Sequence, residues 1–99
     1  MTKDPTGIAD NVKTGFGFNA YPNPFTNSLT FEISMPLEGR TNIEIFDLMG
    51  RLLETIEVPE SSQNIYLIKW HPDNLPQGVY NAVINSGNIT KSIRINLIN

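Results

Sequence analysis

The sequence contains no cysteine, which excludes disulfides, thiolate metal sites and cysteine nucleophiles. Its single histidine, His71, stands in a proline-flanked turn and has no second ligand at the spacing of a zinc site. Charged residues make up only 17% of the chain and the formal net charge is −3, so its charge does not favour binding to nucleic acid or anionic lipid. No apolar run reaches the length of a membrane span, and the polar residues 1–10 do not resemble a cleavable signal peptide.

Residues 1–15 differ in composition from the rest of the chain. Their only branched aliphatic side chains are Ile8 and Val12, and the segment cannot bury enough apolar surface to order itself. We therefore predict that it is a linker or disordered tether. Residues 16–99 have the size of one small domain. We also hold as a hypothesis that the chain is one end of a longer protein.

Apolar and polar residues alternate along most of the domain, and this period of two predicts β-strands. The alternation is clearest in residues 28–35, where every second residue from Leu29 to Met35 is apolar. The predicted strands are residues 16–21, 28–35, 41–46, 51–58, 64–70, 78–84 and 89–98. Short turns join them, so the chain is predicted to be all-β. The expected fold is an immunoglobulin-like or fibronectin III-like antiparallel β-sandwich of about seven strands.

Two of these strands carry local irregularities. Gly17 and its neighbour Gly15 weaken the strand at residues 16–21. In residues 51–58, Leu53 breaks the parity of the other apolar residues, which a bulge near Leu52-Leu53 would reconcile. A helix over residues 48–56 is the alternative for this segment. The preceding Asp47-Leu48-Met49-Gly50 has the residue types of a type I turn.

The later strands are expected to supply much of the core. Residues 78–84 are almost continuously apolar, which predicts a central strand that is covered on both faces. A turn at residues 85–88 leads to the last strand, where every second residue from Ile93 to Leu97 faces inward. Trp70, the only tryptophan, is predicted to be the largest single contributor to folding, at about 4–6 kcal/mol as an upper bound.

The segment Tyr21-Pro22-Asn23-Pro24-Phe25 is predicted to form a stiff, extended corner. Each proline fixes its own φ angle, lacks an N–H group and favours extended geometry in the residue before it. We expect Asn23 to bond nearby backbone, and Tyr21 and Phe25 to anchor the two sides of the corner in the core.

No set of residues in the sequence predicts catalysis, a metal site or a bound cofactor. The glutamates, including Glu54, fall mostly on predicted solvent-facing positions, and Asp47 and Asp73 are explained by turn hydrogen bonds. Asn88-Ile89-Thr90 matches the glycosylation triplet, but a match of this length arises by chance. A sugar-binding aromatic face is an alternative that would use Tyr21, Phe46, Tyr66, Trp70 and Tyr80.

Several short motifs, taken in order, resemble the C-terminal sorting domain of proteins exported by the type IX secretion system. They are Tyr21-Pro22-Asn23-Pro24-Phe25, Leu29-Thr30-Phe31, Asp47-Leu48-Met49-Gly50-Arg51, Ile68-Lys69-Trp70, Leu75-Pro76-Gln77-Gly78-Val79-Tyr80 and an alternating, basic last strand. The resemblance covers residues 20–98 and depends on the succession of motifs rather than on any one of them.

This resemblance implies a targeting device and not an enzyme. In this family the domain ends a larger secreted protein of a Gram-negative bacterium. The cargo crosses the periplasm, and the domain then engages the outer-membrane translocon for delivery to the surface or the medium. A sortase-like cell-surface peptidase usually removes the domain, which here places the expected cut within residues 1–17. The chain departs from the family in its last residues, Leu97-Ile98-Asn99, because many members have a lysine-rich final strand.

The resemblance also gives a set of suspected recognition residues. These are Pro22, Asn23, Pro24, Phe25, Gly50, Gly78, Val79, Tyr80, Lys91, Ile93, Arg94 and Ile95. The last strand is expected to lie at a sheet edge, where unpaired backbone groups can capture a partner strand or a second copy of the domain. The alternatives are that this strand merely completes the sheet, and that the whole domain is a carbohydrate-binding or adhesion module.

Overall fold

The computed structural model describes residues 17–34, 37, 39–59 and 65–98. The predicted linker at residues 1–15 lies outside these residues, as do Phe16, Met35 and Asn64 at the ends of three predicted strands. The described chain forms seven strands: β1 (Phe18–Tyr21), β2 (Leu29–Ile33), β3 (Thr41–Phe46), β4 (Leu52–Val58), β5 (Tyr66–Trp70), β6 (Gly78–Ser86) and β7 (Ile89–Leu97). The alternative helix over residues 48–56 is wrong, because β4 occupies most of that segment.

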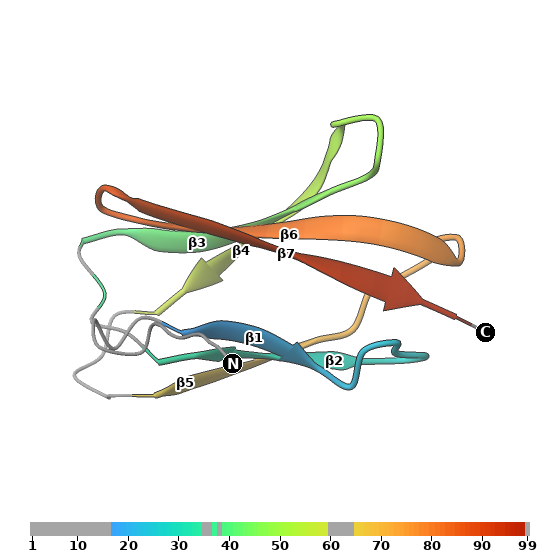
Figure 1. Ribbon diagram of the computed structural model, residues 1–99, viewed down its shortest axis with the longest axis horizontal. Helices are drawn as coiled ribbons and strands as arrows, with labels where there is room; N and C mark the ends of the chain where they lie inside the picture. The colour runs from blue at the N-terminus through green and yellow to red at the C-terminus, as the bar shows by residue number, and fades with distance from the viewer. Residues whose placement is uncertain (1–16, 35–36, 38, 60–64, 99) are drawn as a thin grey trace, which may run out of the picture.

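The strands form two antiparallel sheets that face each other as a sandwich (Figure 1). One sheet has the order β1-β2-β5 and the other β4-β3-β6-β7. The predicted all-β antiparallel sandwich is therefore confirmed. Among the residues that the structure describes, none belongs to a helix long and apolar enough to cross a bilayer.

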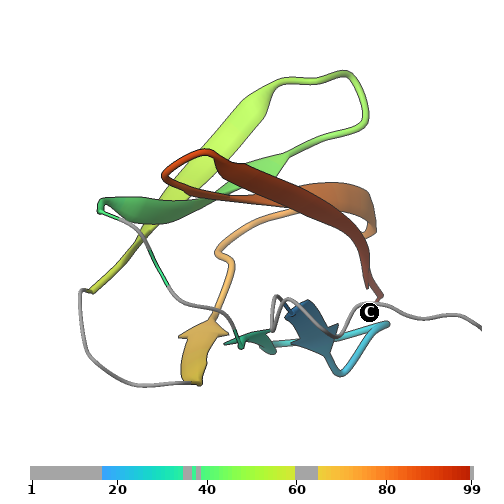
Figure 2. The same ribbon diagram turned by 60° about the vertical axis from the view of Figure 1, so that its left-hand side comes forward.

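The core lies between the sheets and follows the predicted alternation. Every second residue of β2 and of β3 is buried, from Leu29 to Ile33 and from Thr41 to Ile45. The buried apolar residues are Phe18, Phe25, Leu29, Phe31, Ile33, Ile43, Ile45, Val58, Tyr66, Trp70, Tyr80, Ala82, Ile84, Ile95 and Leu97. These side chains pack together between the two sheets, whose separation is visible in Figure 2.

Strand β6 lies in the interior of its sheet, as predicted, between β3 and β7. It runs to Ser86, beyond the predicted end of the strand, and only Gly87 and Asn88 turn the chain into β7. Gly87 has φ 58°, which glycine adopts without steric cost at the first position of a tight hairpin turn. The expectation that both faces of this strand are covered is wrong, since Val79 and Val83 on its outer face are only half-buried.

The bulge that the apolar pattern of β4 required is present. Ile45 pairs with Glu54, whereas its neighbour Phe46 pairs with Leu52, so Leu53 is the extra residue. The bulge returns Ile56 and the residues after it to the register that the core needs.

Trp70 joins the two sheets through both its ring and its indole N–H. The side chain is buried at 4% exposure, and its ring centroid lies 6.0 Å from those of Phe25 and Phe31. Its Nε1 donates to Glu54 Oε1 on β4 over 3.0 Å. Glu54 is exposed, as predicted, but the prediction missed that its carboxylate also accepts this hydrogen bond. The bulge places Glu54 opposite Ile45, at a position where its carboxylate satisfies a buried donor.

Candidate functional site: the edge of the last strand

The segment that follows β1 leaves the three-stranded sheet and lies along β7 of the other sheet. We call residues 22–25 the strap. The peptide bonds before Pro22 and Pro24 are both cis. Because the two prolines have no N–H groups, pairing with β7 falls to Asn23 and Phe25. The strap is visible as the light-blue loop beside the end of β7 in Figure 2.

The Asn23 side chain bonds the backbone of β7 as a neighbouring strand would. Its Nδ2 donates to the Arg94 carbonyl over 2.9 Å, and its Oδ1 accepts from the Asn96 N–H over 3.0 Å. The side-chain carboxamide has an N–H donor and a C=O acceptor next to each other, as a backbone peptide group does. It can therefore form the pair of hydrogen bonds that a neighbouring strand would form. The prediction that Asn23 bonds backbone close to it in the sequence is therefore wrong. The two residues whose backbone it bonds lie 71 and 73 positions further along the chain.

Phe25 continues the pairing with its own backbone. Its N–H donates to the Asn96 carbonyl and its carbonyl accepts from the Ile98 N–H, both over 2.9 Å. These bonds form a parallel bridge between Phe25 and Leu97. The Phe25 side chain is 1% exposed, so the predicted anchor is present.

Tyr21, the other predicted anchor of the corner, is 43% exposed, and that prediction is wrong. Phe18 and Ala20 face the core, so alternation along β1 turns Tyr21 outward beside Thr30.

The start of β6 lies on the other side of β7 from the strap. Gly78, Val79 and Tyr80 pair with Leu97, Asn96 and Ile95 in turn. The buried Tyr80 also donates its hydroxyl to the Pro76 carbonyl, which ties the preceding loop to this strand. Three motifs that are far apart in the sequence are therefore adjacent in the fold.

The other half of β7 has an open edge. β7 is the last strand of its sheet, and the bonds to Phe25 show that the backbone of Asn96 and Ile98 faces away from β6. Thr90 and Ser92 have the same parity, so their N–H and C=O groups point to the same side. No hydrogen bond from a described residue reaches these backbone groups. The expected free edge is thus confined to one half of the strand.

Gly50 belongs to a separate, self-contained turn between β3 and β4. Its φ of 87° requires a residue without a side chain, and its N–H donates to the Asp47 carbonyl over 3.0 Å. Asp47 Oδ1 accepts from the N–H groups of Met49 and Arg51, each over 2.9 Å, and Asp47 Oδ2 accepts from Arg51 Nε over 3.1 Å. The N–H of Arg51 is the main cause that holds the pKa of Asp47 below its ordinary value.

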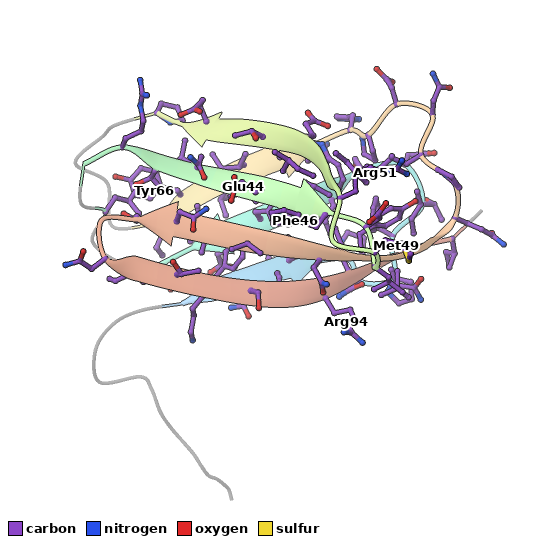
Figure 3. The ribbon with its side chains drawn as sticks, turned by 90° about the horizontal axis from the view of Figure 1, so that it is seen from above. Glu44, Phe46, Met49, Arg51, Tyr66 and Arg94 are labelled. Carbon is purple, nitrogen blue, oxygen red and sulfur yellow. The ribbon has the colours of Figure 1, made fainter. Side chains whose placement is uncertain are left out.

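This turn projects apolar side chains into solvent. Leu48 is 60% and Met49 91% exposed, and the hairpin rises away from the sheet in Figure 1. Figure 3 places Met49 and Arg51 toward the same end of the sandwich as Arg94, and Tyr66 toward the other. Among the described residues no hydrogen bond joins this turn to the strap.

The suspected recognition residues thus fall into distinct places. Those that the structure brings together around the end of β7 are Pro22, Asn23, Pro24, Phe25, Gly78, Val79, Tyr80, Arg94 and Ile95. Gly50 lies in its own turn. Lys91 and Ile93 lie in the other half of β7, opposite Ile84 and Ala82.

Sequence reasoning missed the outward backbone of Asn96, Thr90 and Ser92. Backbone groups are the same in every residue, so composition carries no signal for them. Which residues of β7 direct their backbone N–H and C=O groups outward can be assigned only when one hydrogen bond to the outer edge is known.

The structure offers no aromatic platform for a sugar in the region it describes. Trp70, Tyr66 and Tyr80 are buried to 5% exposure or less. The other two aromatic candidates, Tyr21 and the half-buried Phe46, lie on different sheets. The described residues also contain no group of three side chains suited to hold a metal ion.

A family model and a solved structure each match most of the chain. The family model described as the secretion system C-terminal sorting domain matches residues 19–98. No curated protein matches the chain. Among solved structures, the chain is similar to part of PorZ, described as an essential bacterial surface component of the type-IX secretion system of Porphyromonas gingivalis. The TM-score is 0.61 and the identity 26%, over 84% of this chain and 12% of that one. The chain therefore spans only a small part of that protein.

Proposed function

The chain belongs to the family of secretion system C-terminal sorting domains, and from this premise we propose that it delivers a larger cargo protein to the bacterial cell surface. In this proposal the cargo crosses the periplasm and then passes the outer membrane through the type IX translocon. The domain is the part that the translocon recognises, and it carries out no reaction of its own.

The observation that carries this proposal is the extent of the family match. It begins inside β1 and ends just beyond β7, so it includes the strap and the last strand together. A signal of this extent is a folded surface rather than a short linear peptide. The similarity to part of a type IX surface component supports the same secretion system.

The proposed removal of the domain after export fits the start of the sandwich. The expected cut for the sortase-like peptidase lies within residues 1–17, and the first strand begins at Phe18. Gly17 is bonded through its backbone N–H and C=O to Ser34, each over 2.9 Å. Because cleavage needs an extended and unpaired backbone, this pairing disfavours a cut at Gly17 itself.

A fusion experiment tests the proposal. Residues 15–99 are joined to the C-terminus of a reporter that carries its own periplasmic leader, in a cell with a working type IX system. We expect the reporter to become accessible to protease added outside the cell. In a matched strain without the translocon the same fusion should stay in the periplasm. A reporter that remains periplasmic in both strains would refute the sorting function.

Two further fusions separate the parts of the signal. Removal of residues 89–99 takes away β7 and the bonds of the strap, and we expect it to abolish delivery. A fusion of the whole chain, residues 1–99, should be delivered as well as the fusion of residues 15–99, because both contain the whole of the described sandwich. Normal delivery without residues 89–99 would show that the last strand is not part of the signal.

A further inference from the structure

We infer that the hairpin turn between β3 and β4 docks into an apolar pocket on a protein partner, with a carboxylate of that partner facing Arg94. The side chains that enter the pocket are those of Leu48, Met49 and Leu52, which we call the tip surface. This inference rests on the proposed function, because it names the part of the sorting domain that the secretion machinery contacts and the chemistry of that contact.

The tip surface is apolar and lies in solvent. Leu48, Met49 and Leu52 are 60%, 91% and 48% exposed. Leu52 pairs with Phe46, so both side chains project from the outer face of the four-stranded sheet, where Phe46 adds half-buried apolar area beside the tip. Single exposed apolar side chains are ordinary, but neighbouring ones gathered on one element mark a site of interaction.

The polar groups of the turn do not oppose its burial. Four backbone N–H groups donate within the turn, namely those of Asp47, Met49, Gly50 and Arg51. Both carboxylate oxygens of Asp47 are occupied, and its charge is paired with that of Arg51. Burial of a polar group is costly when it loses its bonds to water and gains none, which does not apply to these groups. The same bonds fix the turn in one geometry before docking, which lowers the entropy lost on binding.

Arg94 gives this face a charge that remains to be complemented. It is exposed on the outer face of β7 and lies in the same cross-strand row as Phe46, because Asn81 of β6 pairs with both. Figure 3 shows Arg94 and Met49 toward the same end of the sandwich. Within the described part of the chain, no carboxylate forms an ion pair with the Arg94 guanidinium. The partner that fits therefore has a carboxylate at the rim of its apolar pocket.

Charge and shape disfavour the other occupants of the tip surface. Glu54 and Glu57 are exposed on β4, directly after the turn, and the formal net charge of the chain is −3, so anionic lipid headgroups would repel this hairpin. In a symmetric pair of domains the same patch meets itself, and one projecting turn offers no pocket to another. A pocket on a different protein remains the occupant that fits both the projecting shape and the charge of Arg94.

Substitutions at Met49 test whether the pocket is apolar. Met49→Gln keeps the length of the side chain but adds a polar amide, whereas Met49→Leu stays apolar. Neither change should affect folding, because the side chain is 91% exposed. In the reporter fusion we expect Met49→Gln to lower surface delivery by roughly tenfold, as an amide buried without hydrogen bonds would, while Met49→Leu is delivered normally. Equal delivery of the two variants would overturn the inference.

Charge reversal at Arg94 tests for the facing carboxylate. Arg94→Glu places two like charges together and should lower delivery by roughly tenfold, whereas Arg94→Lys keeps the positive charge and should be delivered nearly normally. Both variants retain the backbone carbonyl that Asn23 bonds, and slow exchange of the Asn96 amide would show that the strap is intact in each. Normal delivery of Arg94→Glu would overturn the inference.

Cross-linking from the tip identifies the class of the partner. A photoreactive diazirine side chain is introduced at position 49 alone in the reporter fusion and is activated in the cell. We expect an adduct with a protein other than the fusion, absent from the matched strain without the translocon. Its cross-linked peptide should carry apolar residues beside an aspartate or glutamate. An adduct only with lipid, an adduct only with a second fusion molecule, or no adduct from a fusion that is delivered would overturn the inference.

The outcomes separate this inference from the proposed function. If the unmodified fusion is not delivered, the sorting function itself fails. If the unmodified fusion and its Met49→Gln and Arg94→Glu variants are all delivered equally, the sorting function stands and only docking through the tip surface fails. Reduced delivery of both variants, with normal delivery of Met49→Leu and Arg94→Lys, is the result that the inference predicts.

Discussion

The strap and the turn after β3 use the same chemical device over very different distances. Asn23 bonds backbone groups 71 and 73 residues away, whereas Asp47 bonds backbone groups two and four residues away. The turn closes on itself and is complete without the rest of the chain. The strap is complete only when both sheets are in place, because it leaves one sheet and pairs with the last strand of the other.

This difference indicates which motif holds the fold and which displays a surface. Breaking the strap should loosen the contact between the sheets and free the end of β7. Breaking the turn should change only the tip of a hairpin, where Leu48 and Met49 lie in solvent. The predictions below test this distinction from the largest expected effect to the smallest.

Replacing the Phe25 side chain should have the largest effect. Phe25→Ala removes a ring that is 1% exposed, and truncation of a buried phenylalanine costs about 3–5 kcal/mol of unfolding free energy. Urea unfolding of the isolated domain measures this loss. Phe46→Ala is the matched control on the half-buried outer face, with an expected loss below about 2 kcal/mol. Equal losses for the two variants would show that Phe25 is not a special anchor.

Removing the Asn23 side chain should have a smaller effect. Asn23→Ala deletes two hydrogen bonds to β7, at a net cost of about 1–2 kcal/mol. The Asn96 amide should also exchange faster, since its acceptor is gone. Asn19→Ala, on the exposed outer face of β1, should change the unfolding free energy by less than about 0.5 kcal/mol. Unchanged exchange at Asn96 would contradict the pairing described for the strap.

The charge of Asp47 should have a pH-dependent effect confined to acid. Its pKa lies below the ordinary value of 3.8, chiefly because the Arg51 N–H donates to the carboxylate. The ionised form therefore stabilises the folded state above pH 3.8, and this contribution is lost as the pH falls through the lowered pKa. Asp47→Asn cannot ionise, so the stability difference from the unmodified protein should shrink as the pH falls through that range. A difference that does not vary with pH would contradict this account.

Substitution at the tip of the turn should leave stability nearly unchanged. Met49→Ser alters a side chain that is 91% exposed, and such changes fall within about 0.5 kcal/mol. Thermal unfolding of the variant measures this directly. A loss comparable to that of Phe25→Ala would show that the turn packs against the sandwich rather than projecting from it.

Features that depend on residues close together in the sequence could be predicted, and contacts between distant segments could not. The alternation from Leu29 to Ile33, the turn at Asp47 and the bulge at Leu53 each follow from residues close together in the chain. The partners of Asn23 and the bond from Trp70 to Glu54 depend on how the two sheets meet, which no local pattern encodes.

The suspected recognition residues show the same division. The strap and Gly78 were named from motif resemblance alone, and nothing local indicated that β7 lies between them. The exposure of Tyr21 could have been predicted, because β1 alternates and Phe18 faces inward. The outward parity of Ser92 could not, since it follows from a bond between segments at opposite ends of the domain.

Amide hydrogen exchange along β7 of the isolated protein tests most directly whether the strap divides this edge. The amides of Lys91, Ile93 and Ile95 face β6 and supply an internal reference for a stable ladder. We expect Asn96 and Ile98 to be protected with them, and Thr90 and Ser92 to exchange much faster. Equal protection at Ser92 and Asn96, or fast exchange at both, would contradict the account.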